Sequence, residues 1–197
     1  DSETLLIVGA GTVARSLTAA YTAVFPSIRK ILVWARRIEQ AKALVAGISL
    51  PGIDIAAMSD LAAAAAQADI ISTATMAREP VLKADWVRPG THVDLIGAFK
   101  ADMREADDAL ISSASLFVDS RDTTLHHIGE LMIPIANGLI TENAVRGDFY
   151  DLVSGDAKAR QSKDEVTLFK NGGGAHLDLM TARYIFEKVA GATDVQA

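Results

Sequence analysis

The sequence of 197 residues predicts an α/β fold in which helices doubly wind a parallel sheet. Three observations predict it. Short apolar runs alternate with segments of helical periodicity over most of the first 119 residues. The first apolar run breaks into a glycine-rich turn, and a helical segment follows that turn. Half of the residues are apolar, which is enough for one sizeable core, and no internal repeat or linker divides the chain.

The first strand is predicted at Leu5–Val8, because this apolar run is too short for a buried helix and leads directly into glycine. A helix is predicted after the glycines and is ended by Pro26. Its apolar residues recur at helical spacing, namely Val13, Leu17, Ala20, Tyr21 and Val24.

The next elements continue the alternation. Further buried strands are predicted at 31–34, 53–56, 69–73, 91–96 and 116–119. Helices are predicted over 37–46, over the alanine-rich segment 61–66 with Ser59 as its N-cap, and over 105–113. Strands and helices in this order are typical of a parallel sheet with right-handed crossovers.

The pattern changes after Asp119, where we expect a helical C-terminal segment. Short helical pieces are predicted over 121–127, 131–136 and 149–153, with Thr141 as a cap, followed by a strand over 166–169 and a final helix to Val189. Three glycines precede that helix. Either a ligand contacts bare backbone there, with Gly173 as the candidate residue, or the glycines form a flexible turn.

Composition excludes several classes of function. The net charge is −6 without a basic block, which argues against nucleic-acid binding. Cysteine is absent, so disulfides, thiolate metal sites and a cysteine nucleophile are excluded, as expected for a cytoplasmic protein. No apolar stretch approaches the roughly 18 residues of a membrane helix, and no signal peptide is visible. The chain opens at Asp1 directly before a strand, so we expect it to be the interior of a longer protein.

The glycine pattern G-x-G-x-x-A predicts a dinucleotide site. In such a site Gly9 allows the tight turn, Gly11 lets the backbone approach a pyrophosphate, and Ala14 lets the helix pack closely on the strand. The pyrophosphate would lie at the helix start, at Thr12 and Val13. The alternative is a strand–turn–helix junction that carries glycine for steric reasons alone. The neighbouring strands favour the dinucleotide site.

The end of the second predicted strand indicates which dinucleotide is bound. An NAD site usually places a carboxylate there, to bind the ribose 2′-hydroxyl. Here Arg36 and Arg37 follow the strand and no carboxylate is present. Arginine binds a 2′-phosphate through charge-assisted hydrogen bonds, so we predict NADP(H) as the preferred cofactor, with NAD(H) possible. The alternative is that both arginines belong to a solvated helix start.

Small residues end two further predicted strands at the carboxyl edge, where ligands of open α/β sheets bind. Thr73, Ala74 and Thr75 suit a ribose or a pyrophosphate. Ile96 and Gly97 are expected near a nicotinamide ring. Both sets are equally compatible with ordinary strand-end turns.

The remaining ionisable residues predict no catalytic group and no metal site. His126, His127 and Glu130 have a possible metal-binding spacing, but a third ligand is not evident. His92 is predicted to be a structural histidine with a satisfied ring, and His176 opens the last helix beside the glycines. A run of carboxylates, Glu105, Asp107 and Asp108, is interpreted as a solvated helix start.

The chain resembles the ornithine cyclodeaminase/mu-crystallin family from end to end. The matching stretches are Gly9–Gly11 with Ala14, Val33–Arg36, Ser72–Pro80, Trp86–Val93, Gly97-Ala98, Arg104-Glu105, Val118–Ser120, Gly129-Glu130, Glu165-x-Thr167-x-Phe169, and Gly173 with Ala175 and Asp178. This many ordered matches are far more specific than the glycine turn alone.

The resemblance implies that residues 1–197 are the dinucleotide-binding domain of an NAD(P)-dependent oxidoreductase that acts on small amino or imino acids. Family members include ornithine cyclodeaminases, alanine dehydrogenases and ketimine reductases. They are typically homodimers formed through a separate substrate domain, which carries the arginine and lysine that hold the substrate carboxylate. That domain is absent from this chain, so no catalytic residue is assigned.

Two departures from the family pattern narrow the expected activity. Val13 stands where the glycine turn usually has glutamine, and Phe99 stands where cyclodeaminases and alanine dehydrogenases carry a catalytic aspartate. Phenylalanine cannot exchange a proton, which favours a reductase of cyclic imino acids such as Δ1-pyrroline-2-carboxylate or Δ1-piperideine-2-carboxylate. Asp102, close by in the sequence, is the alternative carboxylate for this aspartate. The alternatives are an ornithine cyclodeaminase and a non-catalytic, crystallin-like NADPH-binding protein.

Overall fold

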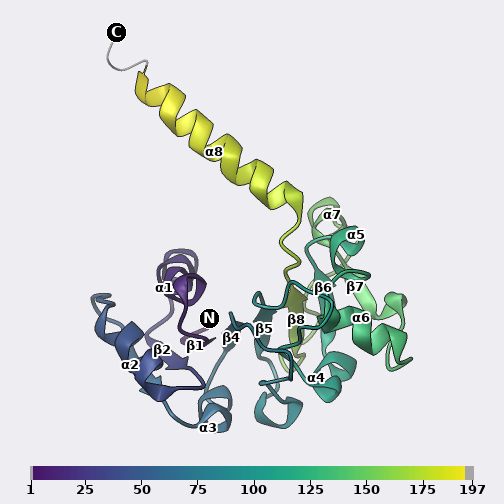
Figure 1. Ribbon diagram of the computed structural model, residues 1–197, viewed down its shortest axis with the longest axis horizontal. Coiled ribbons are helices and arrows are strands. Elements are labelled where there is room, and N and C mark those ends of the chain that lie inside the picture. Colours follow the sequence, from purple (N-terminus) through teal and green to yellow (C-terminus); the bar gives the residue numbers. More distant parts are fainter. Residues whose placement is uncertain (1, 194–197) are drawn as a thin grey trace.

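A computed structural model describes residues 2–193, and over these residues eight parallel strands form one sheet (Figure 1). The strands are β1 Thr4–Val8, β2 Lys30–Trp34, β3 Asp54–Met58, β4 Ile70–Thr73, β5 His92–Leu95, β6 Ser115–Val118, β7 Val145–Gly147 and β8 Thr167–Lys170. Their spatial order is β3-β2-β1-β4-β5-β8-β6-β7. This confirms the predicted fold class, in which the chain winds outward in both directions from β1 and β4.

The helices lie on both faces of the sheet. They are α1 Thr12–Val24, α2 Ile38–Ala46, α3 Leu61–Ala65, α4 Asp108–Ser113, α5 Arg121–Thr124, α6 Gly129–Ala136, α7 Phe149–Ser154 and α8 Ala175–Thr193, with single 3-10 turns η1 Ala84–Trp86 and η2 Glu142–Ala144. Leu5 and Ile7 of β1 pack with α1 and α2, whereas Leu6 and Val8 pack with α3, α4 and α6. Because successive side chains of a strand alternate between faces, β1 is apolar throughout its buried length.

The sheet continues into the segment that we expected to be mainly helical. β8 corresponds to the predicted strand over 166–169, and it lies between β5 and β6, pairing Leu168 with both Val93 and Leu116. β7 was not predicted and pairs with the outer side of β6. The C-terminal segment is therefore helical only in part, and its two strands belong to the same sheet as β1–β6.

Several helix boundaries differ from the predicted ones; α6, for example, begins at Gly129 and α8 extends to Thr193. The N-cap of α3 is Asp60 and not Ser59, because the Asp60 carboxylate accepts a hydrogen bond from the N–H of Ala63. Helix α4 begins at Asp108, three residues later than expected, after a cap in which Asp107 accepts from the N–H of Leu110. Helix α5 ends at Thr124, so the histidines that follow it are not helical.

The buried face of α1 is narrower than the predicted apolar stripe. Ala14 and Thr18 are buried, whereas Val13 and Val24 are exposed. The small Ala14 lets the helix lie close to β1, which turns Val13 outward.

Helix α8 leaves the carboxyl edge of β8 and extends away from the sheet (Figure 1). Its large apolar side chains are exposed, among them Leu179, Met180, Tyr184, Ile185 and Phe186. Among the described residues, no helix has the length and apolarity needed to cross a membrane.

Candidate functional site

The glycine turn between β1 and α1 depends on a backbone conformation that favours glycine. Gly9 has φ +132°, and a Cβ added to it would lie 2.5 Å from the carbonyl oxygen of Ala74. Its N–H donates to the carbonyl of Trp34 at 2.8 Å. Gly9 thereby joins the carboxyl ends of β1, β2 and β4, and any side chain would force β4 away.

Gly11 has a different role, because its lack of a side chain leaves the space in front of the start of α1 open. It is the N-cap of α1 and makes no side-chain cap hydrogen bond. A Cβ added to it would meet no atom within 4 Å. The first N–H groups of a helix have no partner within the helix, so the start of α1 presents open donors and the positive end of a 13-residue helix dipole.

Two hollows flank this turn. One of about 280 Å³ is lined by Gly9, Gly11, Arg36 and Thr75 among others, and one of about 410 Å³ by Thr12, Arg15 and Leu44 among others. Ala10, Gly11 and Gln40 border both hollows. The turn is therefore accessible from two sides.

The cations near the turn are unequally placed. Arg36 lines the smaller hollow, whereas Arg37 is the N-cap of α2, is exposed and is not among the lining residues. Arg15 lines the larger hollow and donates to the carbonyl of Gly47 at 3.0 Å. Arg15 and Gln40 are site residues that the sequence pattern did not predict, although both lie within one or two helical turns of predicted site residues.

These features fit a dinucleotide. Thr12 and Val13 are exposed, so their backbone N–H groups are accessible at the start of α1. The Val13 side chain is 50% exposed and offers an apolar surface beside these groups. Oriented N–H groups at a helix start bind phosphate oxygens, and a guanidinium at the end of β2 adds a cation where a ribose would lie. The donor set present therefore matches a pyrophosphate flanked by nucleosides.

The ends of β4 and β5 meet beside the turn, as predicted. Thr73 is fully buried, and its hydroxyl has no hydrogen-bond partner among the described residues. Ala74 and Thr75 line the smaller hollow, and the N–H of Ile96 donates to the carbonyl of Thr73 at 2.9 Å. Gly97 packs so closely that an added Cβ would lie 2.2 Å from the carbonyl oxygen of Thr75.

The interpretation of Glu105 as part of a solvated helix start is wrong. Glu105 is fully buried ahead of α4. Its Oε1 accepts from the N–H and the hydroxyl of Thr75, at 2.8 and 2.7 Å, and its Oε2 from the N–H groups of Gly97 and Ala98, at 2.7 and 3.2 Å. One carboxylate thus joins the segments that follow β4 and β5.

A second carboxylate supports the first. Glu130, at the start of α6, is fully buried and accepts from the N–H groups of Glu105 and Ala106 at 2.8 and 3.0 Å. Burial raises the pKa of Glu130 to about 7. Lys170 at the end of β8 is also fully buried, and its Nζ donates to the carbonyl of Leu95 at 2.9 Å.

Lys170 is the cation that faces this buried acidic region. Burial lowers its pKa, while the nearby carboxylates Glu130, Glu105, Asp94 and Asp119 raise it. Burial raises the pKa of Asp94, as it does that of Glu130. The Asp94 carboxylate accepts a hydrogen bond from the hydroxyl of Tyr21 at 2.7 Å. Sequence analysis did not identify this network, because its members lie far apart in the chain.

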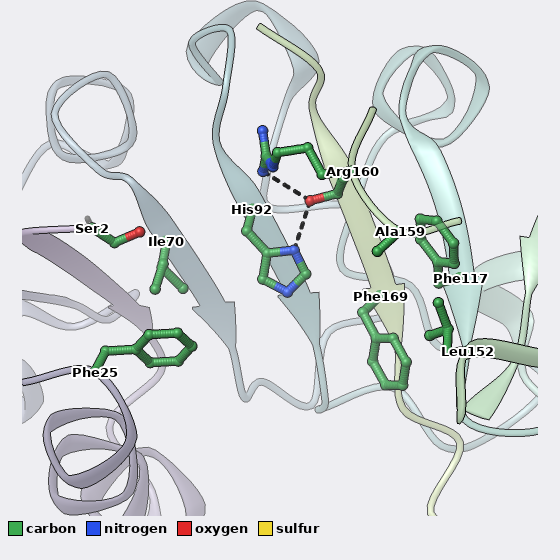
Figure 2. A pocket seen from close by; sticks show the side chains of 10 residues that line it. Ser2, Phe25, Ile70, His92, Phe117, Leu152, Ala159, Arg160 and Phe169 are labelled. Atoms are coloured by element: carbon green, nitrogen blue, oxygen red, sulfur yellow. Dashed lines mark hydrogen bonds between the residues drawn. The ribbon is translucent and has the colours of Figure 1, made fainter. Parts of the chain in front are cut away.

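The histidine at the start of β5 is structural, as predicted. The hydroxyl of Thr167 forms hydrogen bonds with His92 Nδ1 at 2.8 Å and with Arg160 at 3.0 Å, and the side chains of His92 and Arg160 are seen in Figure 2. Burial first, and then the Arg160 charge, lowers the pKa of His92 to about 4, so the ring is neutral at pH 7.

His92 and Thr167 line a separate hollow of about 340 Å³ with Phe25, Ile70 and Phe169 (Figure 2). Ile70, His92 and Thr167 are the first residues of their strands. This hollow is therefore at the amino-terminal part of the sheet, away from the edge where open α/β folds bind ligands.

No group of three or more metal-ligating side chains occurs within residues 2–193. His126 lies 3.5 Å from Glu142, and Glu130 points into the buried network instead. His176 opens α8 as expected; its Nε2 is buried without a partner, and its ring meets Phe149 edge-on.

The last candidate positions lie around the final glycines and after β5. Gly173 has φ +68° and open space around it, which suits both alternatives stated for this turn. Phe99 is 51% exposed, and its side chain offers no carboxylate at this position. Asp102 forms an ion pair with Arg78 at 2.7 Å.

Comparison with known proteins agrees with this geometry. The sequence model of the ornithine cyclodeaminase/mu-crystallin family matches residues 1–193. A Δ1-pyrroline-2-carboxylate reductase of Paracoccus denitrificans is 67% identical over 191 residues, which are 97% of this chain and 60% of that protein.

Two solved structures superpose closely. Thermococcus litoralis Δ1-pyrroline-2-carboxylate reductase in complex with NADH and L-proline gives a TM-score of 0.92 at 34% identity, covering 98% of this chain and 60% of that one. An archaeal alanine dehydrogenase dimer with bound NAD gives 0.90 at 28% identity, covering 98% and 59%. The chain thus spans about 60% of the length of these proteins.

Proposed function

The chain belongs to the ornithine cyclodeaminase/mu-crystallin family, and from this premise we propose that residues 1–197 are the dinucleotide-binding domain of an NADPH-dependent reductase of cyclic imino acids. The substrate class is Δ1-pyrroline-2-carboxylate or Δ1-piperideine-2-carboxylate. The observation that carries the proposal is the open helix start at Gly11, in a chain 67% identical to a Δ1-pyrroline-2-carboxylate reductase.

The cofactor-binding residues follow from the two hollows. Gly11, Thr12 and Val13 would hold the pyrophosphate through backbone N–H groups, whereas Gly9, whose N–H donates to the carbonyl of Trp34, would allow the tight turn beside it. Further contacts are proposed at the strand ends and at the last glycine turn, namely Thr73, Ala74, Thr75, Ile96, Gly97 and Gly173. Since Thr73 is fully buried and Glu105 engages both the N–H and the hydroxyl of Thr75, these two residues would act by shaping the site.

A preference for NADP(H) over NAD(H) rests on the end of β2. No carboxylate is present there to bind a 2′-hydroxyl, and Arg36 lines the hollow where that ribose would lie, with exposed Arg37 next to it. The T. litoralis enzyme contains NADH, so the preference needs a direct test. In Arg36→Glu we expect the Kd for NADPH to rise by about tenfold or more, with little change for NADH. Lys42→Glu, an exposed charge reversal on α2, is the matched control.

The bound cofactor would supply a hydride, and the protein would orient the C=N carbon toward it and exclude water. Phe99 offers no group for proton exchange with an amino acid, and Asp102 is held by Arg78. This favours reduction of a preformed imine over deamination of ornithine. The ornithine cyclodeaminase and the non-catalytic NADPH-binding protein are the two alternatives.

The remaining contacts to substrate and partner are proposed to lie in the part of the relatives that this chain does not span. We expect a substrate domain there to hold the substrate carboxylate and to form a homodimer. The exposed apolar side chains of α8, such as Tyr184 and Phe186, suit packing against such a domain. A cytoplasmic location is expected from the absence of cysteine.

The test is an assay of NADPH consumption with each cyclic imine, on protein that includes the substrate domain. We expect turnover of at least one imine and no proline from ornithine. Proline formed from ornithine without imine reduction would instead favour the cyclodeaminase, and tight NADPH binding without any turnover would favour the binding protein.

A further inference from the structure

We propose that Glu105 is a positioning residue for the nicotinamide half of the cofactor. The inference rests on the proposed function and deepens it, since Glu105 touches neither of the hollows beside the glycine turn. It acts through the segments after β4 and β5, whose backbone would contact the ring.

The carboxylate of Glu105 forms hydrogen bonds with both of those segments. Its two carboxylate oxygens accept four hydrogen bonds from three residues, Thr75, Gly97 and Ala98. Its own carbonyl accepts from the N–H groups of Val81 and Leu82, both at 2.9 Å. Both strand ends are thus anchored to the same residue, and Thr75, Gly97 and Ala98 lie outside the regular helices and strands.

The two strand ends lie in close contact around the Glu105 carboxylate. A Cβ on Gly97 would lie within 2.3 Å of Thr75 N and within 2.6 Å of Glu105 Oε1. The β5 segment therefore touches both the β4 segment and the carboxylate. A glycine at 97 is required by this three-way contact, and the contact exists because Glu105 draws both segments together.

Glu105 is itself held in place by a second carboxylate. Glu130 accepts from the N–H groups of Glu105 and Ala106, so the Glu105 backbone cannot shift without breaking those two bonds. Buried Lys170, bonded to the carbonyl of Leu95 at the end of β5, provides the opposite charge. Glu130 of α6 thus holds the Glu105 backbone, and Lys170 of β8 bonds the end of β5.

The adenosine half of the cofactor would lie beside Arg36 at the end of β2, whereas the Glu105 carboxylate bonds residues that follow β4 and β5. Loss of the Glu105 carboxylate should therefore loosen the nicotinamide end and leave the adenosine end intact. A merely structural role would weaken both ends alike.

The experiment compares two ligands on the wild-type chain and on Glu105→Gln. NADPH carries both halves, and 2′-phospho-ADP-ribose lacks the nicotinamide. A neutral amide cannot accept all four hydrogen bonds, so we expect the Kd for NADPH to rise about tenfold while the Kd for the fragment stays within about twofold. The blue shift of NADPH fluorescence on binding should also be reduced. Asp107→Asn is the matched control, because that carboxylate caps α4 and bonds neither strand end.

An equal loss of affinity for both ligands, or no loss for either, would overturn the positioning role. If Glu105→Gln does not fold, Thr75→Val removes one of the four hydrogen bonds with little change of shape, and the same selective loss is expected at smaller size. Failure of the wild-type chain to bind either ligand would instead refute the proposed function.

Discussion

Alanine at each of the two glycines of the first turn should produce opposite defects. In Gly9→Ala the side chain is forced into φ +132° and against a backbone oxygen 2.5 Å away. The strained conformation costs about 1–3 kcal/mol, and the overpacking a similar amount. We therefore expect the free energy of unfolding to fall by about 2–6 kcal/mol, which is a large part of the stability of a domain.

In Gly11→Ala the backbone is already extended, with φ −86° and ψ −170°, and the new methyl group meets nothing. The loss of a favourable N-cap residue is offset by reduced entropy of the unfolded chain, so stability should change by less than about 1 kcal/mol. The methyl group would instead occupy the space through which a pyrophosphate approaches the helix start. We expect the Kd for NADPH to rise at least about tenfold.

The assay for both variants is urea unfolding, followed by circular dichroism, together with NADPH titration of the folded protein. A Gly9→Ala variant as stable as the wild type would refute the steric account of the turn. A Gly11→Ala variant that binds NADPH normally would refute the placement of the pyrophosphate.

Two further predictions concern the buried ionisable groups. Lys170→Met removes the hydrogen bond to Leu95 and the positive charge that faces Glu130 and its neighbours. We therefore expect the free energy of unfolding to fall by about 3–5 kcal/mol. In the control Lys163→Met, at an exposed position, the free energy of unfolding should change by less than about 0.5 kcal/mol. An unchanged stability of Lys170→Met would contradict the charge balance described for this network. His92 is held neutral in the fold, with a pKa of about 4 against 6.5 in the unfolded chain, so its contribution to stability is complete above pH 6.5 and is lost as the pH falls through 4. Between pH 7 and pH 5 the wild type should therefore lose about 2 kcal/mol more than His92→Gln, and equal losses in urea unfolding would show that the ring is not held neutral.

The positions of the first six strands along the chain could be predicted because each is a short apolar run bounded by turn residues or helical periodicity. The sheet residues of the C-terminal part were harder to predict. β7 has only three residues, and its central Arg146 is exposed. The position of β8 between β5 and β6 is a long-range pairing that the local pattern of residues 167–170 does not specify.

The site shows the same division. The local sequence predicts the turn at Gly9 and Gly11, because the steric needs of glycine are local. In contrast, the carboxylates at 105, 107 and 108 have the pattern of a solvated helix start. That prediction holds for Asp107, which caps α4, and fails for Glu105, which is fully buried. Glu105 is buried because donors from two other segments converge on it, and those donors become neighbours only when the sheet forms.

The most direct test of the account is a nuclear magnetic resonance titration of the chain with NADPH, following the backbone amides. The account predicts that the largest shifts occur at Gly11, Thr12 and Val13, with Arg36 and Gln40 also affected. Shifts confined to Ile70, His92 and Thr167 around the hollow at the amino ends of the strands, with the glycine turn unchanged, would contradict it.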